Sequence, residues 1–218
     1  MLLQTAYFPP VEYFALLARD MTLSPDRVIP SNASIEAMET YRKQSYRNRC
    51  YILGPHGREM LQVPVVHSED MSIRSVRIEY TTPWVVRTER AIDAAYKSSA
   101  WFDEYREQLF AILDAREEHL FDLNLSLIRF FLAKTGIDCR LEETTSFRRT
   151  APDDFREAIH PKKDNAILRN LGLERPYYQV FSEKYGFTPN LSVMDLLFNE
   201  GPDSILWLKS LRQITWGQ

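Results

Sequence analysis

The sequence predicts an α/β or α+β fold in which a mixed central sheet is covered by a helical layer. Strand-like segments dominate from about residue 1 to 82, and helical periodicity dominates about residues 83–218. The chain has 218 residues, 44% of them hydrophobic and 26% charged, which is ordinary for a globular domain. We therefore expect a single domain over residues 1–218, with its sheet in the N-terminal third and its helices in the middle and C-terminal regions.

Strands in the N-terminal part follow from alternating apolar residues and from turn signals. Pro9 and Pro10 end the first strand and open a helix, because a missing N–H costs little at a helix start. The Gly54–Gly57 segment predicts a hairpin loop between two strands. Strands are expected at Leu2–Phe8, Arg27–Pro30, Tyr41–Leu53, Arg58–Val66 and Ser75–Tyr80, and a helix at Val11–Arg19.

Helical spacing takes over after Trp84, and Gly136 is placed to end the last long helix. Ser192 can cap a later helix. A return strand is expected at Asp138–Glu142, and His160–Arg175 is expected to be a loop. Helices are expected at Val85–Tyr96, Trp101–Phe121, Asn124–Lys134, Asp153–Ile159, Val193–Phe198 and Ser204–Leu211.

Composition narrows the class of protein. The 27 basic and 30 acidic residues are mixed along the chain, which disfavours a nucleic-acid binder. No apolar run approaches ~18 residues, and the N-terminus has no signal-peptide pattern, so we expect neither a membrane span nor secretion. Cys50 and Cys139 lie far apart without metal-ligand spacing, which favours free thiols in the cytoplasm and no disulfide. No motif indicates a metal or a cofactor, and the oligomeric state stays open.

Polar side chains crowd the apolar C-terminal third. Buried amides cost free energy unless they are paired. These groups therefore either tie this corner of the fold to itself or face a ligand. The candidates for substrate binding here are Tyr178, Gln179, Asn190, Ser192, Asp195 and Asn199.

A second candidate lies at the turn between the first strand and the first helix. Ligands of α/β sheets sit at the carboxyl ends of strands, where Gln4 and Tyr7 are expected. Gln4 would orient a substrate, and Tyr7 would bind it or move a proton. The structural alternative is that Tyr7 only anchors the turn in the core.

A third candidate is a basic stretch that combines arginine with amides. Arg47 and Arg49 would hold an anion, since guanidinium matches phosphate or carboxylate in a two-pronged fork. Gln44 and Asn48 would orient the acceptor. The alternative is a solvated strand face.

Two further residues have the chemistry of catalysis. His160 titrates near neutrality and would act as general acid or base, with lysines beside it for phosphate; the alternative is a surface histidine. Cys50 follows an arginine, which lowers a thiol pKa, although a free buried cysteine is the simpler reading.

Ordered motifs along nearly the whole chain resemble the WbqC-like protein family. They run from Gln4 with Tyr7-Phe8-Pro9 and Tyr13-Phe14, through Tyr46 with Asn48-Arg49, Trp84, Ala95-Tyr96-Lys97 and Ala100-Trp101-Phe102, to Asn190-Leu191-Ser192 and Asp195–Gly201. The resemblance implies a context of bacterial sugar or polysaccharide metabolism, in which a group is transferred onto an activated sugar. One departure is that no histidine stands near Arg87–Arg90, where relatives would have one.

Together these features predict a cytoplasmic transferase-type enzyme that acts on a small anionic or activated metabolite, such as a nucleotide-linked sugar. The alternative is a non-catalytic module that binds a metabolite or a protein. If the first reading holds, the N-terminal turn, the Tyr46–Arg49 segment and the Tyr178–Asn190 segment should meet in space.

Overall fold

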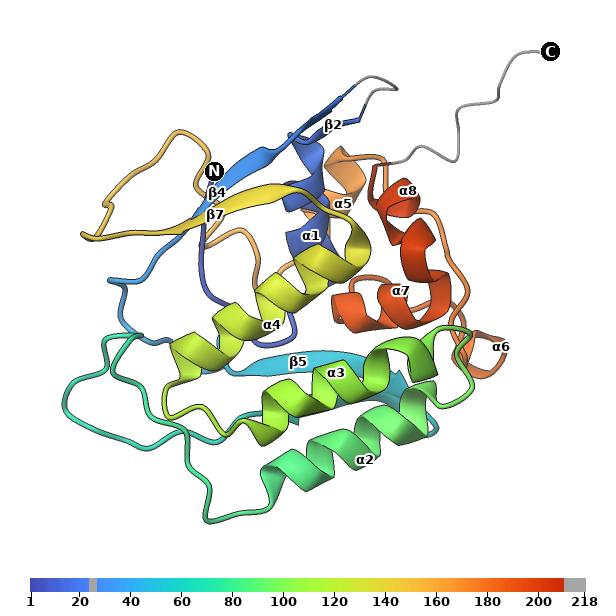
Figure 1. Cartoon of the computed structure of the whole chain (residues 1–218), viewed down its shortest axis with the longest axis horizontal. Coiled ribbons are helices and arrows are strands. Elements are labelled where there is room, and N and C mark those ends of the chain that lie inside the picture. The colour runs from blue at the N-terminus through green and yellow to red at the C-terminus, as the bar shows by residue number, and fades with distance from the viewer. Residues whose placement is uncertain (24–26, 210–218) are drawn as a thin grey trace.

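A parallel three-stranded sheet forms one side of the molecule in a computed structural model that describes residues 1–23 and 27–209 (Figure 1). Its strand order is β1 (Leu2–Leu3), β4 (Ser31–Ile35) and β7 (Cys139–Glu143). Leu3 pairs with Ile35, and Ala33 pairs with Leu141. The expected α/β class is confirmed.

Helices make the connections between these parallel strands. Helix α1 (Val11–Arg19), which has the bounds expected from the sequence, lies between β1 and β4. Helices α2 (Trp84–Tyr96), α3 (Phe102–Asp114) and α4 (Leu120–Thr135) come between β4 and β7. Gly136 ends α4 with φ of 73°, a left-handed conformation that glycine adopts without steric cost.

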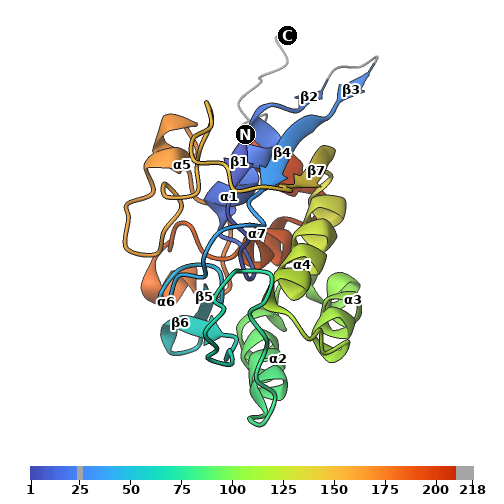
Figure 2. The ribbon, with the colours of Figure 1, turned by 90° about the vertical axis from the view of Figure 1, so that its left-hand side faces the viewer.

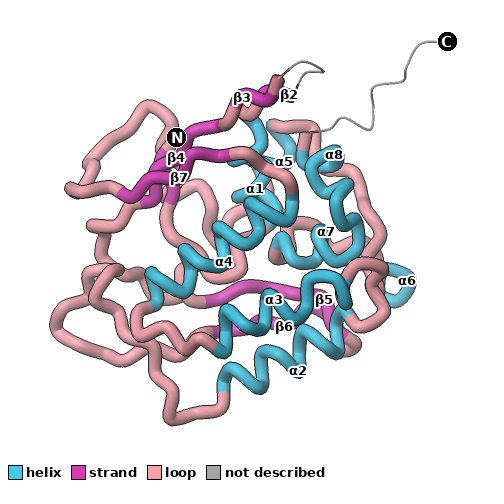
Figure 3. Tube along the Cα trace, in the orientation of Figure 1, coloured by secondary structure: helices cyan, strands magenta, loops and turns pink. Residues whose placement is uncertain are grey.

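Among the described residues, antiparallel strands form two hairpins, besides isolated antiparallel bridges. Strands β2 (Thr22–Leu23) and β3 (Val28–Ile29) form one at the edge of the molecule (Figure 2). Strands β5 (Arg49–Gly54) and β6 (Gly57–Gln62) form the hairpin predicted from Gly54–Gly57. Figure 3 shows the β5–β6 hairpin and the parallel sheet as separate groups of strands, with helices between them.

The C-terminal region consists of the short helices α5 (Ala166–Asn170), α6 (Ser182–Tyr185), α7 (Val193–Glu200), the 3₁₀ turn η1 (Gly201–Asp203) and α8 (Ser204–Leu208). Of these, α5, α7 and α8 pack against α1. Every residue of α1 except Arg19 is buried, so this helix is the centre of the core.

Several expected elements differ from the structure. The strand expected at Leu2–Phe8 stops at Leu3, because its partner β4 ends opposite it at Ile35. Ser75–Tyr80 makes only isolated bridges, from Arg77 and Ile78. The segment expected as helix Asp153–Ile159 instead bonds to β1 through Phe155, whose N–H donates to Leu2 O. The expected loop after His160 contains α5. The expected Trp101–Phe121 helix is split between α3 and α4. Part of the expected Ser204–Leu211 helix lies outside the described residues.

Candidate functional site

The three segments expected to form one site do meet. The backbone N–H of Tyr7 donates to Tyr46 O at 2.8 Å. On the other side of the turn, Val11 N–H donates to Leu191 O at 2.9 Å, and Val193 N–H donates to Pro9 O at 2.8 Å. The N-terminal turn thus joins a segment near residue 46 to a segment near residue 191, directly after the expected Tyr178–Asn190 segment. That Gln4, Asn48 and Gln179 share one site stays a prediction.

Glu12 lies at this junction, in the first turn of α1. Its side chain is buried, and its Oε2 atom has no hydrogen-bond partner within the described part of the chain. Burial raises the pKa of Glu12 to about 7; Asn190 lowers it in part, and the charge of Asp164 raises it. The Glu12 backbone N–H also donates to Asn190 Oδ1 at 3.0 Å. A carboxyl group with a pKa near neutrality and an unused oxygen can accept a proton from a bound molecule.

A cavity of about 400 Å³ is lined by two neighbours of Glu12, Asp164 and Asn190. Glu12 itself is buried behind this lining, and we call the cavity the Glu12 pocket. Residues from four separate parts of the chain line it: Tyr46, Arg58, Pro161, Lys163, Asp164, Asn165, Arg169, Glu174, Thr188, Pro189 and Asn190. The N-terminal half of the lining comes from the loop before β5 and from β6. The rest comes from the loop before α5, from α5 itself, from the loop after α5, and from the loop before α7.

The cations of the Glu12 pocket differ in how they are engaged. Arg169 pairs with Asp164 at 3.5 Å and with Glu174 at 3.2 Å. The Arg58 guanidinium lies 3.8 Å from the centroid of the Tyr51 ring, and Lys163 Nζ donates to a backbone carbonyl, Glu157 O. Neither Arg58 nor Lys163 pairs with a carboxylate among residues 1–23 and 27–209. These two cations are therefore free to meet an anionic ligand.

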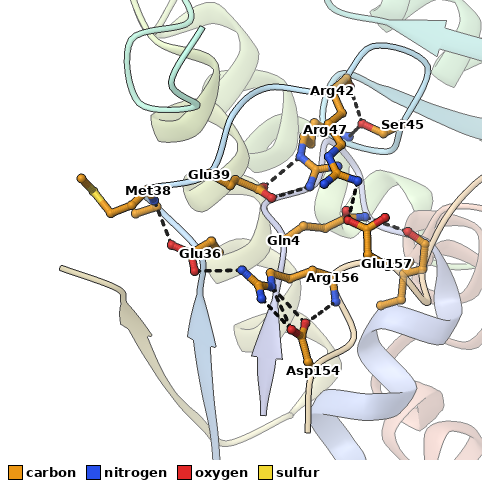
Figure 4. Close-up of polar contacts among 12 residues, drawn as sticks. Gln4, Glu36, Met38, Glu39, Arg42, Ser45, Arg47, Asp154, Arg156 and Glu157 are labelled. Carbon is orange, nitrogen blue, oxygen red and sulfur yellow. Dashed lines mark hydrogen bonds and ion pairs between the residues drawn. The ribbon is translucent and has the colours of Figure 1, made fainter. Parts of the chain in front are cut away.

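A second polar cluster lies at the carboxyl ends of the parallel strands (Figure 4). Glu36 follows β4 and is fully buried. Its Oε1 accepts from Thr144 Oγ1 at 2.6 Å, and its Oε2 accepts from Arg156 Nη1 at 3.1 Å. Arg156 also pairs with Asp154 at 2.6 Å. We call this group the Glu36 cluster; it ties the segment after β7 to the end of the sheet.

Arg47 belongs to this closed network rather than to an open anion site. Its guanidinium donates through Nε and Nη2 to both carboxylate oxygens of Glu39, and its side chain is 2% exposed (Figure 4). The structure therefore corrects the expectation that Arg47 holds a ligand, since its charge is already matched inside the fold.

The amides expected to orient a substrate are also engaged in the fold. Gln4 Nε2 donates to Ile159 O at 2.8 Å, and Asn48 Nδ2 donates to Val63 O at 2.9 Å. Each keeps a buried side-chain oxygen without a partner in the described chain. Gln44 is exposed and accepts from Lys162 Nζ at 2.9 Å.

Arg49 begins β5 and is half-buried; its Nε atom has no hydrogen-bond partner among the described residues. Arg49 forms no ion pair among the described residues, and the buried Asp195 bonds to Tyr177 and Gln179 instead. Arg49 does not line the Glu12 pocket.

Of the two residues expected to move protons, Tyr7 lies in the core. Its ring packs against Phe8 and Trp84 with no exposed surface. Burial raises the pKa of Tyr7 well above its ordinary value, which opposes proton transfer at neutral pH. The structure thus favours the alternative in which Tyr7 anchors the turn.

His160 lies next to the chain segment that lines the Glu12 pocket. Its Nδ1 accepts from Lys162 N–H at 3.2 Å. Burial lowers the pKa of His160, and the charges of Lys162 and Lys163 lower it further. A neutral imidazole is therefore favoured at this place.

The C-terminal candidates divide between core and surface. Asp195 Oδ2 accepts from Tyr177 OH at 2.7 Å and from Gln179 Nε2 at 2.8 Å. Burial raises the pKa of Asp195 to about 6, and the hydrogen bonds from Tyr177 and Gln179 oppose that rise. We call these three residues the Asp195 network. Asn199 Nδ2 bonds to Asp195 O at 2.7 Å.

The other C-terminal candidates have separate roles. Ser192 caps α7, as expected, by accepting from Met194 N–H at 3.4 Å. Tyr178 is 60% exposed. Asn190 alone among these candidates lines the Glu12 pocket.

The two cysteines of the chain do not line the Glu12 pocket. Cys50 is a buried free thiol whose pKa is raised by burial, which opposes a nucleophilic role, and Cys139 is also free. No cluster of His, Cys, Asp and Glu side chains with metal-ligand geometry occurs in the chain as far as it is described. None of the described helices is long and apolar enough to cross a membrane.

Sequence reasoning missed Glu12, Arg58 and the Glu36 cluster. The signal for Glu12 was present: it is the one acidic residue in the otherwise apolar segment Val11–Ala18. A lone carboxyl group on a helix buried on all sides must be paired or must titrate abnormally. Arg58 and Glu36 gave no such signal, because only the fold brings their neighbours close.

Comparison with known proteins agrees with the motifs. A family model described as the WbqC-like protein family matches residues 4–173, which include Glu12, Arg58 and Lys163 but not Asn190. The chain is 25% identical over 201 residues to "Uncharacterized protein Rv1507c" of Mycobacterium tuberculosis, a match covering 79% of this chain and 85% of that protein. No solved structure matches. The matched region spans most of the chain, and the chain therefore belongs to the WbqC-like protein family.

Proposed function

We propose that this protein is a cytoplasmic transferase-type enzyme that acts on a small anionic or activated metabolite in the Glu12 pocket. The observation that carries the proposal is the buried Glu12 carboxyl, which has a pKa of about 7 and an oxygen without a partner. It lies behind the lining of a cavity in which Arg58 and Lys163 form no ion pair among the described residues. The carboxyl group of Glu12 is a proton acceptor, and the cations of the cavity bind negative charge. Transfer of a group to a hydroxyl or amine needs both.

In this mechanism the second substrate is a hydroxyl or an amine, whose oxygen or nitrogen forms a bond to the transferred group. Glu12 takes the proton that this hydroxyl or amine loses. The bond from the transferred group to the donor breaks, and its electron pair leaves on an anionic leaving group. Arg58 and Lys163 stabilise the negative charge of the donor and of the leaving group. Asn190 holds Glu12 and the N-terminus of α1 in place, through its bond to the Glu12 N–H.

His160 has an accessory role in this proposal. It lies beside the loop that carries Lys163, and its lowered pKa makes it a neutral acceptor at physiological pH. It can take over the proton from the site or bind a hydroxyl group of the substrate. Nucleotide-linked sugars are the substrate class that the family context favours, since they carry both an anionic part and an activated group.

The first experiment is a thermal-shift screen against nucleotide sugars, acyl-CoA species and amino acids, because a ligand of the native state raises the melting temperature. Hits are repeated with Arg58→Gln and Lys163→Gln. Arg90→Gln is the matched control, because Arg90 is an exposed arginine on α2 that does not line the Glu12 pocket. The proposal expects the shift to disappear in the first two variants and to persist in the control.

Glu12→Gln separates an enzyme from a binding module. The amide keeps the size of the side chain but cannot accept a proton. For an enzyme, Glu12→Gln still binds the ligand and loses turnover by about 10²–10⁴-fold, the usual contribution of general base catalysis. If a ligand binds the wild type and no product forms with any acceptor tested, the module is favoured. If Arg58→Gln and Lys163→Gln leave the shift unchanged, the Glu12 pocket is not the binding site.

A further inference from the structure

A larger cavity, of about 630 Å³, opens at the carboxyl ends of the parallel strands, beside the Glu36 cluster. Its lining includes Met38, Arg42, Phe147, Arg149, Arg156 and Glu157. Nothing in the mechanism proposed for Glu12 uses these residues. The position matters, because open α/β sheets bind their ligands outside the carboxyl ends of the strands. We call this cavity the Phe147 pocket.

Phe147 is an exposed aromatic ring in a fixed setting. It is 56% exposed, although a large apolar side chain gains free energy by burial. The Arg156 guanidinium lies 5.3 Å from the ring centroid. Arg156 itself forms ion pairs with Asp154 and Glu36, and these pairs hold its guanidinium group in place beside the ring (Figure 4). An exposed ring with a fixed guanidinium next to it is a platform on which another flat ring can stack.

The interior charges of the Phe147 pocket are engaged in ion pairs. Arg156 pairs with two carboxylates, Asp154 and Glu36, and Glu39 pairs with Arg47. Arg149, by contrast, is exposed and has no ion pair within the described residues.

The other rim arginine can be released at little cost. Arg42 pairs with Glu157, but the two side chains are 60% and 62% exposed. An exposed pair of this kind contributes roughly 0–1 kcal/mol, so a ligand can take the arginine over. Two guanidinium groups are thus available at the rim to grip phosphate oxygens.

From these features we propose that the Phe147 pocket binds an anion that carries a flat ring, with the chemistry of a nucleoside diphosphate. Phe147 stacks on the base, and Arg149 and Arg42 hold the phosphates. This site is separate from the Glu12 pocket, although one loop serves both. Glu157 lines the Phe147 pocket, Lys163 lines the Glu12 pocket, and Lys163 Nζ donates to Glu157 O.

The test is calorimetric titration of the full chain with ADP and UDP, compared with pyrophosphate and with adenosine. The variants are Phe147→Leu, which keeps an apolar side chain but removes the ring, and Arg149→Gln. Both residues are exposed, so neither change removes core packing. Tyr185→Leu and Arg90→Gln are the controls, as an exposed aromatic residue and an exposed arginine outside the Phe147 pocket.

We expect both diphosphates to bind more tightly than pyrophosphate and adenosine. Phe147→Leu and Arg149→Gln should each weaken ADP binding by about 5–100-fold, which corresponds to roughly 1–3 kcal/mol for a lost stacking or charged contact, while the controls bind as the wild type does. If ADP does not bind, or if Phe147→Leu binds ADP as the wild type does, the proposal is wrong.

Arg58→Gln separates this proposal from the function proposed for the Glu12 pocket. If Arg58→Gln abolishes ADP binding and the Phe147 variant does not, the nucleotide belongs to the Glu12 pocket, and only the inference about the Phe147 pocket fails. If ADP binding depends on Phe147 and Arg149 but no hit of the thermal-shift screen depends on Arg58 or Lys163, the inference stands and the function proposed for Glu12 fails.

Discussion

Glu12 and Asp195 are both buried carboxyl groups whose pKa burial raises, to about 7 and about 6, yet their surroundings are opposite. Asp195 Oδ2 accepts hydrogen bonds from Tyr177 and Gln179, inside a closed core. Glu12 has an oxygen without a partner in the described chain and lies behind the lining of a cavity. Both lie near the same junction, since α7, which carries Asp195, is bonded through Val193 to the turn before α1.

The difference shows how to separate a structural carboxyl from one available for chemistry. A raised pKa alone does not distinguish them, because desolvation acts on both. The donors around Asp195 satisfy it, so the network has a structural explanation that needs no ligand. Glu12 lacks that explanation, because its Oε2 atom is buried without a hydrogen-bond partner in the described chain.

Removal of the two carboxyls should have unequal effects on stability, and this is the largest contrast. Asp195→Leu leaves Tyr177 without its acceptor and Gln179 with one bond fewer, so we expect a loss of about 2–4 kcal/mol in the free energy of unfolding at pH 5. Glu12→Leu should cost within about 1 kcal/mol under the same conditions. Urea denaturation measures both. Equal losses for the two variants would contradict the distinction.

The pH dependence of stability should carry a contribution from Glu12. Its pKa in the folded state is about 7, above the ordinary value of 4.5, so the folded protein holds this proton more tightly than the unfolded chain does. The stability that this provides is fully present below pH 4.5 and is lost as the pH rises through 7.

Glu12→Gln should remove this pH dependence. For a pKa shift of this size it amounts to about 3 kcal/mol in the free energy of unfolding between pH 4.5 and 7. Glu104→Gln is the control, since Glu104 is an exposed acidic residue on α3. Asp195→Asn should flatten a lower window, from pH 3.8 to about 6. A Glu12→Gln variant with the slope of the wild type would show that Glu12 titrates normally.

Asn190 should affect the pKa of Glu12 without being essential for the fold. Asn190→Gly preserves the backbone, because Asn190 has φ of 55°, which glycine adopts freely. The variant loses the acceptor for the Glu12 N–H, at a cost of about 1 kcal/mol. Because Asn190 lowers the pKa of Glu12, its removal should raise that pKa. Titration of the Glu12 carboxyl carbon by NMR measures the change, and an unchanged or lowered pKa would exclude this role.

The smallest effect is expected at the cap of α7. Ser192→Ala removes a long hydrogen bond to Met194 N–H, of 3.4 Å, and should cost about 0.5 kcal/mol. The pKa of Glu12 should not change, because Ser192 supports the helix of Asp195 rather than the Glu12 pocket. A shift of that pKa in Ser192→Ala would show that the two regions are coupled.

Local patterns were enough to place much of the chain. The bounds of α1, the β5–β6 hairpin, the end of α4 at Gly136 and the cap at Ser192 all depend on residues close in sequence. The central strand β4 was not foreseen, because its sequence, Ser31–Ile35, is short and half polar and takes its place only by pairing with β1 and β7. The Ser75–Tyr80 segment shows the reverse case, in which alternation occurs without a neighbouring strand to complete a ladder.

The sequence by itself determined the α/β class, the family and the meeting of the N-terminal turn with the segments near residues 46 and 190. It also identified polar residues as candidates for the site. It could not distinguish a side chain that is hydrogen-bonded within the fold from one that has no partner there. Arg47 is the example: its guanidinium group is suited to binding an anionic ligand, but it donates its hydrogen bonds to the carboxylate of Glu39. Only the tertiary structure decided which groups remain open, because the partner of a buried charge is fixed by how distant segments pack. That packing leaves Glu12 with an unused oxygen and gives Asp195 two donors.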